Sequence, residues 1–138
     1  MEKEFIPYEQ ALALKELGFD EPCFAYFGNI SQALFGLKGK IKFYTNTLLD
    51  IDHGKNVVSS ASTFSQAFRW FKEKYKLMSC ITPCSDGEYI FTLYDLNKCD
   101  LEVFVEDIEI MESEDSYEFF EDAELEGLKK LIEIVKNK

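Results

Sequence analysis

The sequence has few of the features that mark catalytic sites and membrane anchors. It holds a single histidine among 138 residues, so no second imidazole can act as a base or a metal ligand. No apolar run approaches the roughly 20 residues that cross a bilayer. Residues 1–4 lack the basic-then-apolar pattern of a secretion signal, and no segment has the spacing of a P-loop. We therefore expect a cytoplasmic protein that is not an enzyme, needs no cofactor and does not bind a membrane.

Positive charge is also scarce. The chain has 15 Lys and Arg against 26 Asp and Glu, a formal net charge of −11. Such a surface repels the phosphates of DNA and RNA and the headgroups of anionic lipids, so direct nucleic-acid binding is not expected. It attracts basic proteins, although in many acidic proteins the charge serves only solubility. The composition leaves both interpretations open.

Apolar and aromatic residues are plentiful. Hydrophobic residues make up 46% of the chain and aromatic residues 15%, which is enough to build a core at this length. We find no internal repeat and no linker, and expect residues 1–138 to form a single α+β domain. Its predicted architecture is a mostly antiparallel sheet of about five short strands packed by three helices.

Two helices are predicted near the ends of the chain. The first covers about residues 7–17, with Pro7 as the first helical residue and Gly18 as a left-handed cap. The other covers about residues 121–136, where acidic residues come first and lysines last, as the helix dipole favours. Gly127 lies inside it and costs about 1 kcal/mol relative to alanine, unless another element packs closely there.

The most strongly marked helix begins after Thr63. Thr63 and Gln66 have the spacing of a capping box, in which each side chain bonds the other residue's backbone N–H. Apolar residues then recur with a helical period as far as residue 75. The period predicts that Phe68 and Phe71 are buried. It predicts that Arg69 and Lys72, on the opposite face, are exposed.

Alternating and aromatic-rich segments predict the strands, at residues 23–27, 41–45, 80–82, 88–96 and 101–105, the last open to extension as far as residue 110. A hairpin with Gly36 and Gly39 in its connection is expected between the first two. Asp86-Gly87 predicts a tight turn between the next two. Residues 46–62 are rich in Asn, Asp, Gly and Ser and are predicted to be a loop.

Four cysteines are present, namely Cys23, Cys80, Cys84 and Cys99. Without a secretion signal a disulfide framework is not expected. Cys80 and Cys84 are spaced within the range of zinc ligands. The neighbours of all four are apolar or strand-like, however, which favours reduced structural thiols, since free cysteine is among the most buried residue types. We therefore expect no metal site at the cysteines.

One short segment has the donors for a divalent metal: Asp50, Asp52 and His53 lie within four residues. The same residue types, followed by Gly54, are typical of a polar loop. We favour the loop, and keep a metal-dependent enzyme as the weakest of three functional hypotheses.

The clearest anomaly is an acidic tract. Between Asp100 and Glu126 there are 13 Asp and Glu residues and no Lys or Arg. Aromatic residues are interleaved with the charges, which indicates a folded or partner-bound surface rather than a solvated tail. One hypothesis is that the protein is an inhibitor whose carboxylates imitate DNA phosphates and so bind a basic host protein. The alternative is that the tract is only the start of a helix, with glutamates that match the helix dipole. The predicted partner-binding residues are Glu112, Glu114, Asp115, Tyr117, Glu118, Phe119 and Phe120.

The helix after Thr63 offers a second candidate. Its polar face is basic and lies beside aromatic rings, which could bind a small anion or stack on a nucleotide. A solvated helix face that pairs with the acidic third of the chain explains the same residues. The ligand-binding residues of this alternative are Arg69, Trp70, Lys72 and Lys74.

Several segments are similar to those of a known family. They are Glu4–Leu12, Leu17–Cys23, Thr63–Tyr75, Glu124–Leu125 and Leu128–Glu133. Together they resemble a family of small uncharacterised proteins from phages and mobile elements of Bacteroides-type bacteria. The resemblance implies a phage or prophage product inside a bacterium, and it implies no activity and no site residues.

Overall fold

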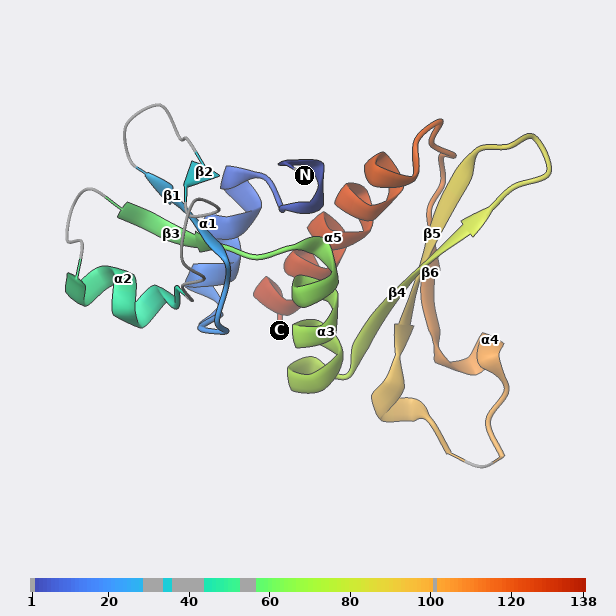
Figure 1. The fold of residues 1–138 in the computed structure, drawn as a ribbon. Helices are drawn as coiled ribbons and strands as arrows, with labels where there is room; N and C mark the ends of the chain where they lie inside the picture. Colours follow the sequence, from blue (N-terminus) through green and yellow to red (C-terminus); the bar gives the residue numbers. More distant parts are fainter. Residues whose placement is uncertain (1, 29–33, 36–43, 53–56, 101) are drawn as a thin grey trace. The chain divides into compact units, whose positions relative to one another are not determined.

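The computed structural model describes residues 2–28, 34–35, 44–52, 57–100 and 102–138 (Figure 1). They form two compact units, Met1–Gln66 and Ala67–Lys138. The helices and antiparallel strands confirm the predicted α+β class, although the strands form two three-stranded sheets rather than one. No helix in these ranges is long and apolar enough to cross a membrane. The prediction of a single domain over residues 1–138 stays a prediction.

Two sequence predictions fall mainly outside the described residues. They are the strand over residues 41–45, of which only Tyr44 and Thr45 are described, and the segment around His53. The glycines of the expected hairpin connection, Gly36 and Gly39, also lie outside them. Tyr44 does pair with the start of the preceding strand region, because Cys23 and Tyr44 exchange backbone hydrogen bonds of 2.9 and 2.7 Å.

The first unit combines two α-helices with a small sheet. A 3-10 turn, Glu2–Glu4, precedes its elements α1 (Tyr8–Glu16), β1 (Ala25–Gly28), β2 (Leu34–Phe35), α2 (Asn46–Asp52) and β3 (Val57–Ala61). β1 lies in the middle of the sheet and pairs antiparallel with β2 and with β3. Apolar side chains from several of these segments are buried, among them Ile6, Leu14, Phe19 and Leu49.

The end of α1 is the one predicted. Gly18 has φ +88°, a conformation that glycine adopts without steric cost. The Gly18 N–H donates to the Lys15 carbonyl (3.0 Å) and the Phe19 N–H to the Leu14 carbonyl (2.9 Å). This pair of bonds is a Schellman motif, which satisfies the last carbonyls of the helix. At its N-terminus α1 begins at Tyr8, so Pro7 is the N-cap residue and not the first helical residue as predicted.

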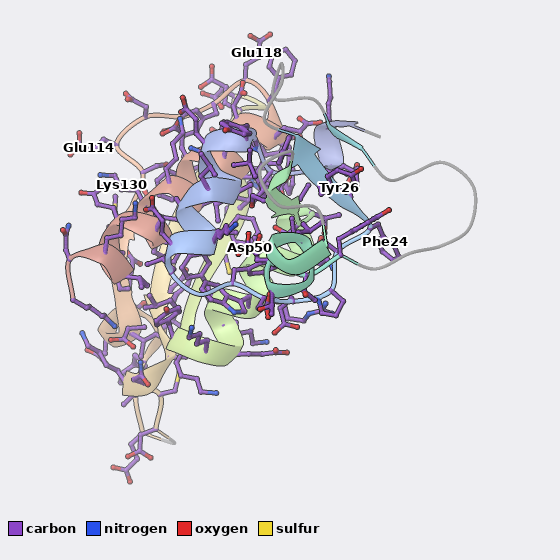
Figure 2. The ribbon with its side chains drawn as sticks, turned by 90° about the vertical axis from the view of Figure 1, so that its left-hand side faces the viewer. Phe24, Tyr26, Asp50, Glu114, Glu118 and Lys130 are labelled. Carbon is purple, nitrogen blue, oxygen red and sulfur yellow. The ribbon has the colours of Figure 1, made fainter. Side chains whose placement is uncertain are left out.

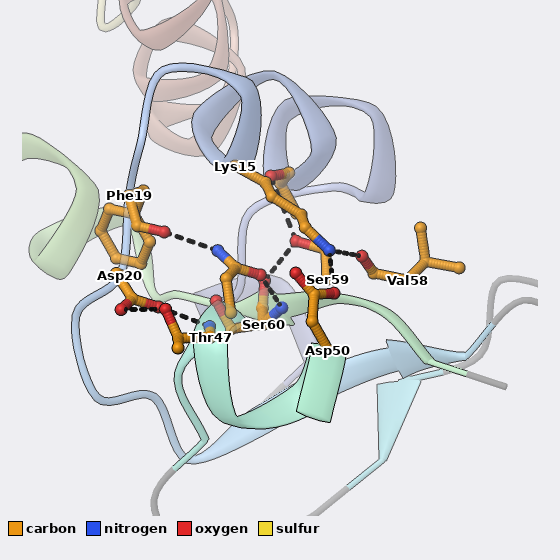
Figure 3. A network of polar contacts seen from close by, with 10 residues as sticks. Lys15, Phe19, Asp20, Thr47, Asp50, Val58, Ser59 and Ser60 are labelled. Carbon is orange, nitrogen blue, oxygen red and sulfur yellow. Dashed lines mark hydrogen bonds and ion pairs between the residues drawn. The ribbon is translucent and has the colours of Figure 1, made fainter. Parts of the chain in front are cut away.

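Residues 46–62 correct the predicted loop, because they contain α2 and β3. Their polar side chains have partners that are distant in sequence. The Asn46 amide donates to the Phe19 carbonyl (2.6 Å) and accepts from the Ser60 N–H (2.9 Å), and the Ser59 hydroxyl donates to the Ala11 carbonyl (3.2 Å) (Figure 3). Buried Asn and Ser therefore join helices to a strand here, where local turn statistics predict solvent exposure.

The second unit packs one long helix on its own antiparallel sheet. Its first helix is α3 (Phe64–Tyr75), whose first three residues belong to the first unit. The elements that follow are β4 (Leu77–Pro83), β5 (Tyr89–Asp95), a 3-10 turn (Leu96–Lys98), α4 (Val105–Ile108), β6 (Glu109–Glu112) and α5 (Phe120–Lys136). The strand order is β4-β5-β6, and α5 packs against β4 and β5 (Figure 1). The β4–β5 turn has Gly87 at φ +88°, as Asp86-Gly87 predicts.

α3 follows the predicted pattern closely. The Thr63 N–H donates to Gln66 Oε1 (3.1 Å) and the Gln66 N–H to Thr63 Oγ1 (3.2 Å), which is the expected capping box. Phe71 is buried, and Arg69 and Lys72 are exposed. Phe68 is only half-buried, so it contributes less to the core than its position in the apolar stripe predicts.

The strand predicted over 101–105 is wrong. Residues 102–104 form no strand and residues 105–108 form α4. The strand β6 begins at Glu109, so only the last two residues of the possible extension to residue 110 are in a strand. β6 pairs with β5 through Leu93↔Met111, with a register shift next to Leu93. The Asp107 carboxylate accepts the Phe104 N–H (3.2 Å), and this local bond favours a helical turn over an extended chain.

The glycine inside α5 is explained by close packing within the second unit. A Cβ on Gly127 would lie 2.8 Å from Ser79 Oγ of β4 and 3.5 Å from Phe91 Cβ of β5. The Ser79 hydroxyl is buried and has no hydrogen-bond partner among the described residues. Close approach of helix and sheet therefore depends on the missing side chain.

We expect Gly127→Ala to destabilise the protein by about 1–3 kcal/mol through overpacking, although helix propensity alone favours alanine by about 1 kcal/mol. Ser79→Ala should cost little, because it removes an unsatisfied hydroxyl. The double variant Ser79→Ala, Gly127→Ala should then recover most of the loss. Urea unfolding of the four proteins measures this, and a stabilising Gly127→Ala on its own would contradict it.

Candidate functional site

The predicted partner-binding residues surround a loop that is tied at both ends to β5. At one end the Ser113 N–H donates to the Phe91 carbonyl (2.9 Å) and the Ser113 hydroxyl accepts the Phe91 N–H (3.2 Å). At the other end Tyr117 and Tyr89 exchange two backbone bonds of 2.8 Å. Between them the Ser116 hydroxyl donates to the Glu88 carboxylate. Both ends of the loop are therefore attached to the sheet by backbone hydrogen bonds.

The carboxylates of this region point into solvent. Glu112, Glu114, Asp115 and Glu118 are all exposed, and Figure 2 shows Glu114 and Glu118 pointing away from the ribbon. None of the four forms an ion pair with another described residue. The Lys130 ammonium of α5 pairs instead with Glu133 (2.8 Å), which raises the pKa of that lysine most, with a smaller contribution from Glu114. Their charge is thus available to a partner.

Three aromatic residues next to these carboxylates differ in their roles. The Tyr117 ring stacks on Phe91 (centroids 6.3 Å apart, 25° between planes), and its burial raises the pKa of the phenol. Phe119 is 57% exposed and Phe120 44% exposed, the latter with its ring edge-to-face on Tyr89. Tyr117 anchors the loop, while the two phenylalanines offer apolar area beside the charges.

We call the exposed members of this set the acidic surface: Glu112, Glu114, Asp115, Glu118, Phe119 and Phe120. The surface runs into the first turn of α5, where Glu121 and Asp122 also lie near the positive end of the helix dipole. The dipole accounts for these two carboxylates. It does not account for the four that precede the helix, because its effect is confined to the first turn.

The first part of the acidic tract, before β6, lies elsewhere in the second unit. Glu102 precedes α4, and Glu106 and Asp107 lie within it. α4 comes before β6 in the chain, whereas the acidic surface begins at the last residue of β6 and continues beyond it. Figure 1 shows these two regions at opposite ends of β6. The tract that is continuous in sequence is therefore two separate surface regions in the structure.

The alternative site on α3 has exposed cations but little free aromatic surface. Arg69, Lys72 and Lys74 are exposed. Trp70 is only 6% exposed, and the Lys74 ammonium lies over its ring at 4.8 Å and over the Tyr75 ring at 5.3 Å. Stacking of a nucleotide base on Trp70 would require the Lys74 side chain to move off the ring.

The donors predicted for a metal are only partly described. Asp50 binds the Lys15 ammonium (2.6 Å), which also donates to the Val58 carbonyl (2.9 Å) (Figure 3). The Lys15 ammonium therefore ties α1 to α2 and β3, and Asp50 is its partner on α2. His53 and the Asp52 side chain lie outside the described residues. In the described ranges, no three His, Cys, Asp or Glu residues are grouped so that they could hold a metal ion.

The four cysteines are free thiols in different environments. Cys23 is buried, and this burial raises its pKa to about 11. Cys80 and Cys84 are half-buried, and desolvation raises the pKa of each. Cys99 departs from the expectation of a structural thiol, because it ends the 3-10 turn Leu96–Lys98 in an exposed position.

One exposed feature was missed by the sequence analysis. Val103, Phe104 and Val105 are 38%, 76% and 61% exposed, although an alternating strand would bury at least one of them. The signal in the sequence is three consecutive apolar residues between charged ones, a pattern that also predicts a strand.

Comparisons with known proteins identify no relative of this chain. No family model matches the chain, and neither the curated proteins nor the solved structures give a significant match. The function of the chain is therefore inferred from the exposure, contacts and charges of the described residues.

Proposed function

We propose that this chain is a small, non-enzymatic, cytoplasmic protein that binds a basic protein through the acidic surface. The observation that supports it most is a row of exposed carboxylates with no ion pair among the described residues, on a loop held at both ends. Unpaired charges of one sign steer a partner of opposite sign and fix its register. A loop that is already ordered loses less entropy on binding.

The two exposed phenylalanines support an interface rather than a merely soluble surface. Aromatic residues are enriched at the centres of protein interfaces and charged residues at their rims. Phe119 and Phe120 lie between the loop carboxylates and those of the first turn of α5. This arrangement favours a contact with an apolar centre and an acidic rim.

The resemblance to phage and mobile-element proteins suggests a biological setting. An accessory factor in that setting can act as an inhibitor that occupies the nucleic-acid-binding surface of a basic host protein. Exposed carboxylates imitate phosphate charge, and the net charge of −11 disfavours competing contacts with nucleic acid itself.

A small-molecule or nucleotide site on α3 is the second candidate. It is favoured by the exposed cations Arg69, Lys72 and Lys74. The covered Trp70 ring weakens it, because stacking would have to displace Lys74.

The test is a charge reversal with a matched control. We expect Glu114→Lys, Asp115→Lys, Glu118→Lys to abolish capture of the protein's partner from bacterial lysate, chiefly by slowing association. The control reverses three exposed glutamates of the first unit, Glu4, Glu9 and Glu21, and changes the net charge equally. With the purified partner, affinity should fall steeply as salt rises above about 0.15 M.

Circular dichroism should show both variants folded, since all six positions are exposed. A partner that binds the loop variant as well as the native protein, with no salt dependence, would contradict the proposal. Loss of binding in both variants alike would reduce it to a net-charge effect.

A further inference from the structure

The turn over Val103–Val105 has an exposure that the fold does not explain. Phe104 is 76% exposed, and its two neighbours are 38% and 61% exposed. Three consecutive exposed apolar residues lower solubility, so soluble proteins avoid them except at functional sites. Phe104 and Val105 bury less than half of their area, so replacing either of them with a polar residue would cost the fold little.

Local hydrogen bonds hold the backbone of this turn. The Val103 N–H donates to the Asp100 carbonyl (3.3 Å), and the Phe104 carbonyl accepts the Asp107 N–H (3.0 Å). The Asp107 carboxylate in turn accepts the Phe104 N–H (3.2 Å). The phenyl ring is therefore presented from a chain that is already ordered, which reduces the entropy lost when a partner binds it.

The charges beside the turn indicate what can cover it. Glu102, Glu106 and Asp107 are exposed on either side of the apolar residues. A second copy of this acidic chain, or an anionic lipid surface, would place like charges together at this point. A pocket with an apolar floor and a rim of Lys and Arg matches both the ring and its flanks.

We propose that Phe104 is an anchor that inserts into such a pocket on a basic protein. The inference depends on the proposed function for the sign of the partner's charge. Its contact residues are different, because the turn and the acidic surface lie at opposite ends of β6 (Figure 1). The partner then touches both ends of this strand, with Phe104 at one and Phe119 at the other.

Photo-crosslinking in the protein's own host cell tests the two contacts separately. The photoreactive p-benzoylphenylalanine replaces Phe104, Phe119 or, as a control in the first unit, Phe24, which is 42% exposed. We expect the probes at 104 and 119 to label the same basic protein and the probe at 24 not to label it. An excess of native chain should block labelling at 104, and an excess of Phe104→Ala chain should block it poorly.

Each pattern decides one of the two claims. Labelling from 119 but not from 104 overturns the anchor and leaves the proposed function standing. Labelling of a basic protein from 104 alone supports the anchor and counts against the acidic surface. Labelling from neither position overturns both, and labelling of a second copy or of lipid from 104 overturns the anchor.

Binding kinetics with the purified partner give an independent readout. Phe104→Ala should raise Kd about 30-fold or more, as expected of an interface hot spot, mostly through faster dissociation. Phe104→Leu should weaken affinity less than Phe104→Ala, and neither variant should change how affinity depends on salt. The triple charge reversal of the acidic surface should instead slow association. A loss below about threefold for Phe104→Ala would overturn the anchor, because hot-spot truncations cost far more.

Discussion

Phe71→Ala is expected to lower the free energy of unfolding by about 3–5 kcal/mol, the range for removing a buried phenylalanine ring. Phe71 is 0% exposed, and its ring lies against those of Trp70 (centroids 5.2 Å apart) and Tyr75 (5.9 Å). Domains of this size have only about 5–15 kcal/mol of stability in total, so the variant should be close to unfolding at 37 °C.

Two variants on the same helix separate burial from helix propensity. Lys72→Ala changes an exposed neighbour and should alter stability by less than about 0.5 kcal/mol. Phe68→Ala removes a half-buried ring and should fall between the two. Urea unfolding followed by circular dichroism gives all three values. If Phe68→Ala proved more costly than Phe71→Ala, the assigned inward face of α3 would be incorrect.

Asn46→Ala is expected to destabilise the first unit by about 2–5 kcal/mol. The substitution leaves two buried backbone groups without a hydrogen-bond partner, and each unsatisfied group costs about 1–3 kcal/mol. Those groups are the Phe19 carbonyl and the Ser60 N–H, both bonded by an amide that is only 6% exposed. One side chain thereby joins the segment after α1, the start of α2 and β3.

The matched control is the neighbouring residue. Thr47→Ala removes one exposed hydroxyl bond to Asp20 (2.6 Å) and leaves the backbone bond from Thr47 to the same carboxylate (2.7 Å). It should cost about 1 kcal/mol or less. Hydrogen exchange should show faster exchange at Ser60 in Asn46→Ala than in Thr47→Ala. Equal exchange in the two variants would contradict a structural role for the amide.

The predictions that the structure confirms depend on neighbours in sequence. Gly18 ends α1, Thr63 and Gln66 cap α3, and Asp86-Gly87 turns β4 into β5, in each case through bonds within about six residues. The wrong prediction of a loop over residues 46–62 depends on distant partners. Asn46 and Ser59 belong to regular elements because Phe19, Ser60 and Ala11 accept or donate their hydrogen bonds.

The candidate site divides in the same way. The sequence showed the surplus of carboxylates and the rings among them, and six of the seven predicted residues are exposed. Only the structure showed that Tyr117 faces inward as an anchor, that Trp70 is covered, and that Val103–Val105 faces solvent. Exposure depends on which segments pack together, and residue type fixes it only in part.

By itself, the sequence determined the α+β class, the C-terminal end of α1, the capped start of α3, the hairpin turn and the sign of the surface charge, because each follows from composition or from bonds between near neighbours. Tertiary structure decided which polar residues are buried, where β6 pairs with β5, and that the acidic tract forms two regions at opposite ends of that strand. These features depend on contacts between residues far apart in the chain, which local propensity does not encode.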